Sequence, residues 1–301
     1  MTKKILITGV SGLIGGILIQ HLSKNSNYDI YGIDRHVALS IRYQLENTPS
    51  SKDLQPILPM KDKFFICDIL DKDELSRIIR DNKIQIIIHL AAVLETETVE
   101  QIERINCNGT KIIFDIAKEQ NLVEMVIYGS SAMTVFGYFE NEPYLSLAKN
   151  IQPKQPLAKI TINDPTIPSH FNPSVKAYCK SKIYGEDLAR QYSSTNGNKV
   201  KFICLRLGYI NTTDDVTSNV NNWSIKANWC SYRDLCQFID RVLENQLKLK
   251  QFHIYFVMSN NDYCWADMEN SREDLITYHS MGLSGVNGTH KKRHPAKSSA
   301  F

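Results

Sequence analysis

Short, uninterrupted apolar runs alternate along this chain with longer amphipathic stretches. The runs consist mainly of Ile, Val, Leu and Phe without polar alternation, at residues 3–9, 28–34, 63–69, 84–92, 123–131, 200–208 and 252–258. Such runs are typical of strands that are covered on both faces. Because helix-length segments separate them, we expect an α/β fold built from repeated βα units around a doubly wound parallel sheet.

Two stretches interrupt this rhythm, residues 36–61 and 139–172, and both are rich in Pro, Ser, Asn and Lys. They predict excursions over the surface. We expect a single domain over residues 1–283, with a small C-terminal substrate-covering lobe contributed by about 139–172 and 209–283. Residues 284–301 have four basic side chains, no acidic one and almost no apolar one. This composition predicts a disordered basic tail.

Composition narrows the classes of partner. The 301 residues include 35 basic and 32 acidic side chains, a balance too even to indicate nucleic acid or an anionic membrane as the main partner. No segment approaches the roughly 18 consecutive apolar residues of a membrane span, and glycines interrupt the apolar N-terminus, so we expect no signal peptide and a cytoplasmic location. The seven cysteines are scattered without a CxxC pair. They predict reduced, mostly buried thiols and no metal site.

The first apolar run leads directly into TGVSGLIGG, in which Gly9, Gly12 and Gly15 have GxxGxxG spacing. Glycines here permit a tight turn and let the backbone approach a pyrophosphate at the start of the following helix. Nineteen residues after Gly15, the second run ends in Asp34, whose carboxylate can accept hydrogen bonds from both hydroxyls of an adenosine ribose. A carboxylate repels a 2′-phosphate, so this Rossmann-type pattern favours NAD over NADP, although the adjacent Arg35 does not exclude NADP.

Tyr178 and Lys182 are four residues apart and therefore share one face if this stretch is helical. Asn172 and Pro173 offer an N-cap and a first helical residue just upstream. The spacing alone is weak evidence of catalysis, because both residue types are common.

The chain resembles the NAD-dependent epimerase/dehydratase family, the extended branch of the short-chain dehydrogenase/reductase superfamily, over about residues 3–280. The resemblance rests on seven motifs in order: TGVSGLIG (8–15), CDIL (67–70), IIHLAA (87–92), NCNGT (106–110), YGSSAMTVFG (128–137), YCKSK (178–182) and LRLG (205–208). The segments 228–244 and 257–275 further resemble the C-terminal part of uronate dehydrogenases and of many uncharacterised relatives.

This resemblance implies that Tyr178 is the acid/base and that Lys182 holds the nicotinamide ribose while its charge favours the phenolate. A phenol with an unperturbed pKa of about 10 needs such help near neutral pH. Asp68 would accept a hydrogen bond from the adenine, and Asn106 would steady the loop near the cofactor. The residues expected to bind NAD are Gly9, Gly12, Leu13, Ile14, Gly15, Asp34, Arg35, Asp68, Ile69, Leu90, Ala91, Ala92, Asn106, Tyr178 and Lys182.

The hydroxyl residue of the catalytic set departs from the family pattern. Ser131 lies six residues before Gly137, where the family usually has five, so strict counting places Ala132 there. We favour Ser131 with a loop one residue longer, and Thr134 is the fallback. Dehydratases of this branch have an Asp-Glu pair directly after the hydroxyl residue. Ala132 and Met133 cannot replace that pair, which argues against dehydration.

Three functions remain open. The first is an NAD-dependent oxidoreductase acting on a hydroxyl or carbonyl group of a sugar or sugar derivative. The second is a nucleotide-sugar epimerase with retained NAD, and the third is a non-catalytic NAD-binding or scaffold protein, against which Tyr178 and Lys182 argue. Recognition of a uronate would need a cation, preferably an arginine, after LRLG, but Lys226 is the only cation from Leu207 to Tyr232. A small-molecule substrate is expected, and a homodimer is a possible assembly.

Overall fold

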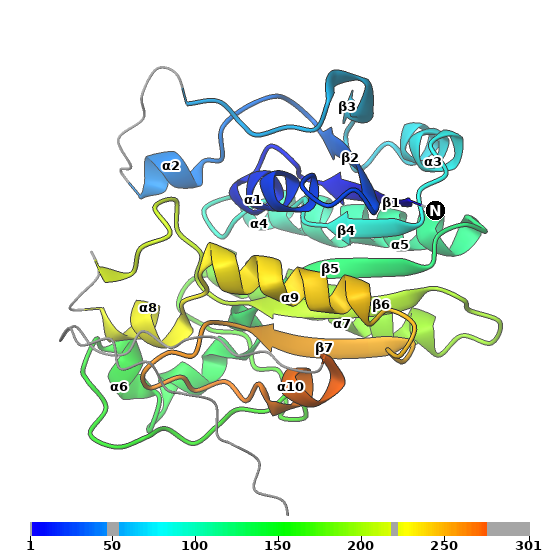
Figure 1. Ribbon diagram of the computed structural model, residues 1–301. Coiled ribbons are helices and arrows are strands. Elements are labelled where there is room, and N and C mark those ends of the chain that lie inside the picture. Colours follow the sequence, from blue (N-terminus) through cyan, green and yellow to red (C-terminus); the bar gives the residue numbers. More distant parts are fainter. Residues whose placement is uncertain (1, 47–53, 218–221, 276–301) are drawn as a thin grey trace, which may run out of the picture.

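The computed structural model describes residues 2–46, 54–217 and 222–275 (Figure 1). Within them, seven strands form one parallel sheet in the order β3, β2, β1, β4, β5, β6, β7. The strands are β1 (Lys3–Thr8), β2 (Tyr28–Asp34), β3 (Phe64–Ile66), β4 (Ile86–His89), β5 (Met125–Ser131), β6 (Lys201–Leu207) and β7 (Phe252–Val257). Each lies within one of the predicted apolar runs, and the predicted doubly wound sheet is confirmed. The predicted tail, 284–301, lies outside the described residues.

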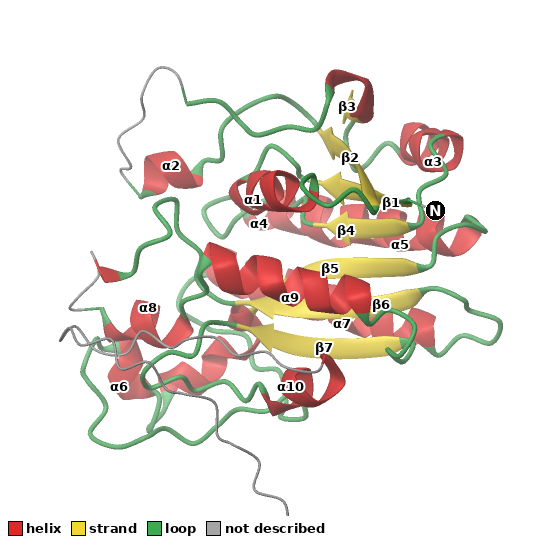
Figure 2. Cartoon of the chain, viewed as in Figure 1, coloured by secondary structure: helices red, strands yellow, loops and turns green. Residues whose placement is uncertain are grey.

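Helices cover both faces of the sheet (Figure 2). One face packs against α1 (Leu13–Leu22) and α9 (Tyr232–Glu244), and the other packs against α3 (Lys72–Asp81), α5 (Gly109–Glu119) and α7 (Pro173–Ser193). Successive residues of a strand point to opposite faces, so Ile5 and Ile7 join the first core and Leu6 joins the second. Both faces of the sheet are covered by packed apolar side chains, which is why the strands contain apolar residues without alternation.

Shorter helical segments lie in the connections. They are α2 (Arg42–Leu45), the 3₁₀ segments η1 (Lys61–Lys63) and η3 (Ala132–Glu140), α4 (Val99–Ile102), the π-helical η2 (Glu103–Asn108), α6 (Leu145–Ala148), α8 (Trp223–Asn228) and α10 (Glu269–Leu275). In the part of the chain that is described, no helix has both the length and the apolar character needed to cross a membrane. Six of the seven cysteines are buried, as predicted.

A third apolar cluster lies beyond the sheet, around the fully buried Trp265. It joins the excursion at 139–172 to the segment after β7, because Ile160 N–H donates to the Trp265 carbonyl at 2.7 Å and Asp267 N–H donates to the Ile160 carbonyl at 2.9 Å. Two stretches that are about 100 residues apart in sequence thus pack as one unit beside the sheet. The division into a dinucleotide-binding part and a substrate lobe remains an expectation.

The order of the strands fixes where a ligand can bind. The chain proceeds outward from β1 to β2 and β3, and then returns to β4 on the other side of β1. In open parallel sheets the connections diverge at such a reversal and leave a crevice at the carboxyl ends of the strands. The glycine loop and Asp34 follow β1 and β2 at that edge.

Candidate active site

A cavity of about 400 Å³ lies at the carboxyl edge of the sheet. It brings together every residue that the sequence predicted for the site except Asn106. The predicted residues that line it are Gly9, Gly12, Leu13, Ile14, Gly15, Asp34, Arg35, Asp68, Ile69, Leu90, Ala91, Ala92, Ser131, Tyr178 and Lys182.

The loop after β1 requires glycine at Gly9 and at Gly15. Gly9 has a φ of +69°, and a Cβ there would lie 2.7 Å from the Cα of Ala91. A Cβ on Gly15 would lie 2.6 Å from the carbonyl oxygens of Gly9 and Val10. The loop therefore packs tightly against both the end of β4 and the start of α1, and its backbone is left open to the cavity.

The N-terminus of α1 faces this cavity without a side-chain cap. Gly12 is the N-cap residue, no side chain accepts from the first turn, and that turn contains no acidic residue. The first N–H groups of a helix have no partner within the helix, and the helix dipole makes this end attractive to anions. Leu13, Ile14 and Gly15 thus form a cradle that fits the diphosphate of a dinucleotide.

Asp34 ends β2 beside this cradle. One carboxylate oxygen accepts from Ser11 N–H at 3.1 Å, and the other accepts from Arg35 N–H at 2.8 Å. These contacts fix the carboxylate at the cavity wall, where it retains lone pairs for the hydroxyls of a ribose. Asp68 lies further along the same wall, with its Oδ1 accepting from Leu70 N–H at 2.9 Å. The groups present fit NAD.

Asn106 lies behind the wall of the cavity. Its side chain accepts from Val93 N–H at 2.8 Å and donates to the Val93 carbonyl at 3.0 Å and to Ser181 Oγ at 3.2 Å. The π-helical segment η2 presents it in that position. Asn106 therefore holds the segment after β4 against α7. It is not among the residues that line the cavity, and its predicted role in binding the cofactor stays a prediction.

Helix α7 presents Tyr178 and Lys182 to the cavity. Asn172 Oδ1 accepts from Val175 N–H at 2.7 Å, and Pro173 is the first helical residue, so the predicted cap is confirmed. Both side chains are buried, and Lys182 Nζ lies 5.6 Å from the centre of the Tyr178 ring. Lys182 also donates to the Gly129 carbonyl at 2.8 Å, which ties the helix to β5.

Ser131, the last residue of β5, lines the cavity, whereas Ala132 is buried in the apolar cluster around Trp265. Ser131 Oγ accepts from Met133 N–H at 3.1 Å as the cap of η3. Thr134 is fully buried and donates to the Ser131 carbonyl at 3.0 Å. Of the two hydroxyl candidates, Ser131 and Thr134, Ser131 is the one that lines the cavity and forms a hydrogen bond with Tyr178.

The pKa values depart from the expectation for this pair. Burial raises the pKa of Tyr178, the charge of Glu95 raises it further, and the charge of Arg42 and a hydrogen bond with Ser131 lower it. Burial also lowers the pKa of Lys182 to about 8. The sequence had suggested that Lys182 is the cation that lowers the pKa of Tyr178. In the structure, the cation with the largest lowering effect on that pKa is Arg42.

Sequence reasoning missed two features of this site. One is a buried ion pair between Glu186 and Arg206, one helical turn beyond Lys182. The spacing of Tyr178, Lys182 and Glu186 at i, i+4 and i+8 was a signal that could have revealed it. The other is Arg42, which comes from the excursion at 36–61. The described part of that excursion is mostly exposed or half-buried, as expected, but its residues 38–42 also line the cavity. No local pattern marked Arg42.

Residues 5–211 match the model of the "NAD dependent epimerase/dehydratase family". Among curated proteins, a UDP-glucose 4-epimerase of Pisum sativum is 29% identical over 148 residues, 47% of this chain and 40% of that protein. An uncharacterised epimerase/dehydratase of Staphylococcus aureus strain MRSA252 is 26% identical over 199 residues, 65% of this chain and 50% of that protein. The matched part thus spans half or less of the length of these relatives.

Solved structures show the same fold at low identity. The uronate dehydrogenase from Agrobacterium tumefaciens superposes with a TM-score of 0.61 and 18% identity, covering 89% of this chain and 81% of that one. The UDP-Glc/GlcNAc 4-epimerase from Campylobacter jejuni superposes with a TM-score of 0.57 and 18% identity, covering 86% and 79%. The predicted resemblance to both kinds of protein is confirmed at the level of the fold.

Proposed function

The chain belongs to the NAD-dependent epimerase/dehydratase family, and from this we propose that it is an NAD-dependent oxidoreductase acting on a hydroxyl or carbonyl group of a sugar or sugar derivative. The observation that carries the proposal is the convergence of Ser131, Tyr178 and Lys182 in the same cavity as the glycine loop and Asp34. One end of the cavity suits an adenosine, and the other end has groups that can move a proton.

The cofactor would be held by the N-terminus of α1 at its diphosphate and by Asp34 at its adenosine ribose. Bound NAD supplies the hydride acceptor and a positive charge. Lys182 then holds the second ribose, at a position fixed by its bond to the Gly129 carbonyl. Its pKa of about 8 leaves it mostly protonated at neutral pH.

The phenolate form of Tyr178 would take the proton from the substrate hydroxyl while the hydrogen on the same carbon leaves as hydride to the acceptor, so that the alcohol becomes a carbonyl. Ser131 donates a hydrogen bond to the oxygen that reacts, and the proton on Tyr178 passes to solvent. The phenolate is needed only transiently. Its formation is opposed by burial and by Glu95, and it is favoured by Arg42 and Ser131.

An epimerase with retained cofactor is the second candidate, and one contact favours it. Glu46, after α2, accepts from Thr212 N–H and Oγ–H, both at 2.8 Å. Residues 38–42 line the same cavity as Leu207, Gly208 and Ile210, so this contact joins two parts of its wall. Walls that are held together in this way suit a cofactor that stays bound through turnover. Dehydration is disfavoured, because the residues after Ser131 are the buried Ala132 and the apolar Met133.

A panel of sugars and nucleotide sugars with added NAD tests the proposal. A dehydrogenase produces free NADH, measured as absorbance at 340 nm, and the Tyr178→Phe variant does not. An epimerase converts a nucleotide sugar without net NADH, which chromatography of the sugar product detects. A protein that binds NAD but converts no sugar would favour the non-catalytic scaffold. Homodimerisation and a cytoplasmic location remain expectations that belong to this proposal.

A further inference from the structure

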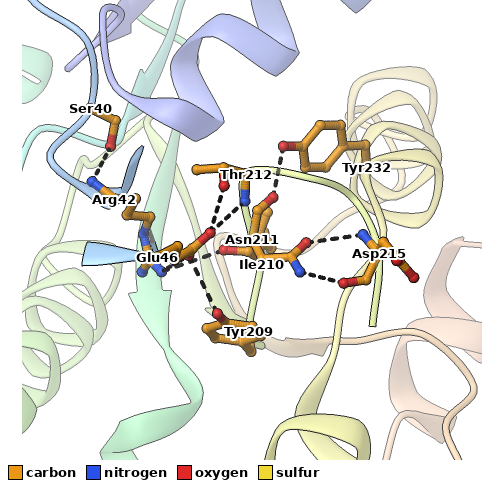
Figure 3. A network of polar contacts seen from close by, with 9 residues as sticks. All are labelled: Ser40, Arg42, Glu46, Tyr209, Ile210, Asn211, Thr212, Asp215 and Tyr232. Atoms are coloured by element: carbon orange, nitrogen blue, oxygen red, sulfur yellow. Dashed lines mark hydrogen bonds and ion pairs between the residues drawn. The ribbon is translucent and has the colours of Figure 1, made fainter. Parts of the chain in front are cut away.

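Arg42 brings a guanidinium group from the first excursion to the wall of the cavity, beside the segment after β6. It lies in α2, and its Nη1 donates to the Ile210 carbonyl at 3.4 Å, across 168 residues of sequence (Figure 3). Ile210 follows the carboxyl end of β6 and lines the cavity together with Tyr178. Arg42 thus lines the same cavity as Tyr178, next to the segment after β6.

Glu46 forms an ion pair with Arg42, but no hydrogen bond joins the two side chains. The closest approach of the ion pair, between Arg42 Nη1 and Glu46 Oε1, is 3.7 Å. Glu46 Oε2 instead accepts the two bonds from Thr212, and Oε1 accepts from Tyr209 Oη–H at 3.4 Å. The carboxylate therefore serves mainly to fasten α2 to the segment after β6 (Figure 3).

That segment is itself held firmly. Tyr232 Oη–H, from α9, donates to the Asn211 carbonyl at 2.7 Å. The Asn211 side chain donates to the Asp215 carbonyl at 2.5 Å and accepts from Asp215 N–H at 3.2 Å. Arg42 consequently contacts a segment whose position is fixed by α9 and β6. A side chain that recognises a ligand needs such a rigid support.

The guanidinium keeps free donors. Among the described residues, neither Nε–H nor the Nη2 amino group of Arg42 has a hydrogen-bond partner, and the side chain is only 28% exposed. A half-buried guanidinium with an open edge is matched by a carboxylate or phosphate, because its planar fork can donate two parallel hydrogen bonds.

The segment after β6 contains no arginine that could bind an anionic group, and Arg42 brings one to the cavity from the first excursion. Lys226, the one cation of the segment 207–232, lies over the ring of Trp223, 4.4 Å from its centre. It does not line the cavity, whereas Arg42 does.

We propose that Arg42 is the specificity-determining residue of this enzyme and that it binds an anionic oxygen group of the substrate, the carboxylate or phosphate of an acidic sugar. The inference rests on the proposed function. The cofactor diphosphate already has the uncapped N-terminus of α1 as its partner. Arg42 instead donates a hydrogen bond to the Ile210 carbonyl in the segment after β6. Its charge also lowers the pKa of Tyr178.

The test measures recognition separately from chemistry. Dissociation constants are determined by calorimetry for the NAD-saturated Tyr178→Phe protein with matched pairs: D-glucuronate against D-glucose, D-galacturonate against D-galactose, and D-glucose 6-phosphate against D-glucose. The same pairs are then measured with Arg42→Gln or Arg42→Lys added. Arg77→Gln, which removes an exposed arginine on α3, is the matched control. Turnover of each pair with NAD is recorded in proteins that keep Tyr178.

We expect at least one acidic sugar to bind more tightly than its neutral partner. Arg42→Gln should reduce that preference about 10- to 100-fold while leaving the neutral sugar and NAD unaffected. Arg42→Lys should retain part of the preference, and Arg77→Gln all of it. Preference for the uronates or for the phosphate ester identifies which anion is bound.

Three results would overturn the inference. They are the absence of any acidic preference, a preference that survives Arg42→Gln, and a loss of NAD affinity with the preference intact, which would assign Arg42 to the cofactor diphosphate. Failure of the proposed function looks different, because it would remove turnover of every sugar while the binding preference and its dependence on Arg42 remain.

Discussion

Arg206 and Glu186 form a two-point ion pair in the interior of the protein. Arg206 Nε donates to Glu186 Oε1 at 3.0 Å, and Nη2 donates to Oε2 at 2.8 Å, with both side chains at most 2% exposed. Ser130 Oγ–H donates to the same Oε1 at 2.6 Å. Because Glu186 lies one turn after Lys182, the pair joins α7 to β5 and β6 directly beside the site.

Breaking this pair from one side should be costly, since it leaves a buried charge without compensation. Glu186→Ala is expected to lower the free energy of unfolding by about 3 kcal/mol or more. Asp187→Ala is the matched control, because it removes an exposed pair with Arg190 on the same helix and should cost less than about 1 kcal/mol. Urea unfolding measures both. Similar losses in the two variants would contradict the assignment.

Replacing both partners tests whether the pair is needed for stability as such. The double variant Glu186→Met with Arg206→Met removes both charges and is expected to be more stable than Glu186→Ala. Among the residues that the structure describes, Arg206 Nη1 has no hydrogen-bond partner, so the ion pair already includes an uncompensated group. A double variant as unstable as the single one would show that neighbouring groups, such as Ser130, depend on the pair.

Asp34 should determine the choice of cofactor. We expect NAD to bind at least about tenfold more tightly than NADP, because the carboxylate repels a 2′-phosphate. Asp34→Ser removes that repulsion and should reduce the ratio of NAD affinity to NADP affinity. Arg35→Gln should increase this ratio. Fluorescence titration measures each affinity. Equal affinities in the wild type would mean that Arg35 governs the pocket.

The two serines at the end of β5 should behave differently. Ser131→Ala is expected to depress turnover by about two orders of magnitude with NAD affinity preserved, because it removes a hydrogen bond to the reacting oxygen. Ser130 bonds to Glu186, so Ser130→Ala should affect stability more than turnover. Steady-state kinetics and thermal unfolding separate these effects. The reverse ranking in turnover would make Ser130 the catalytic hydroxyl.

Tyr178→Phe retains the ring and its packing but removes the group that transfers the proton. Turnover should fall by about 10² to 10⁴, while stability and NAD binding stay near those of the wild type. Tyr184→Phe, on the same helix and partly exposed, is the control and should retain full activity. Normal turnover in Tyr178→Phe would show that another group carries the proton.

Lys182 should leave a signature in the pH dependence of stability. Its pKa is lowered by burial to about 8 in the folded protein, against an ordinary value of 10.5. Between these two values the unfolded chain binds more protons, so the contribution of Lys182 to the free energy of unfolding rises with pH, on the order of 3 kcal/mol in total.

The comparison with Lys182→Met isolates that contribution from other titrating groups. The difference in unfolding free energy, wild type minus variant, should increase from pH 8 to pH 10 when measured by urea unfolding. Lys180→Met, which removes an exposed lysine of the same helix, is the matched control. A difference for Lys182→Met that does not change with pH would mean that the buried ammonium keeps its ordinary pKa.

The sheet, the cofactor loop and the Tyr178–Lys182 pair could all be predicted from the amino-acid sequence, because each depends on residues that are close together along the chain. A strand buried on both faces needs a continuous apolar run, and the turn after β1 needs glycines at Gly9 and Gly15 to clear Ala91 and the backbone. Tyr178 and Lys182 share a face through helix geometry alone. Asp34 follows β2 directly, so its place at the carboxyl edge follows from the strand.

Only the tertiary structure decided which hydroxyl faces Tyr178 and which cation approaches it. Ser131 faces the cavity and Ala132 the apolar cluster because β5 ends at Ser131, a boundary that counting back from Gly137 cannot locate. Arg42 meets Ile210 because Glu46 binds Thr212, in two irregular segments whose pairing no periodicity encodes. Contacts between such loops depend on how the whole sheet brings their ends together. The pattern of apolar and polar residues along the sequence does not encode this arrangement.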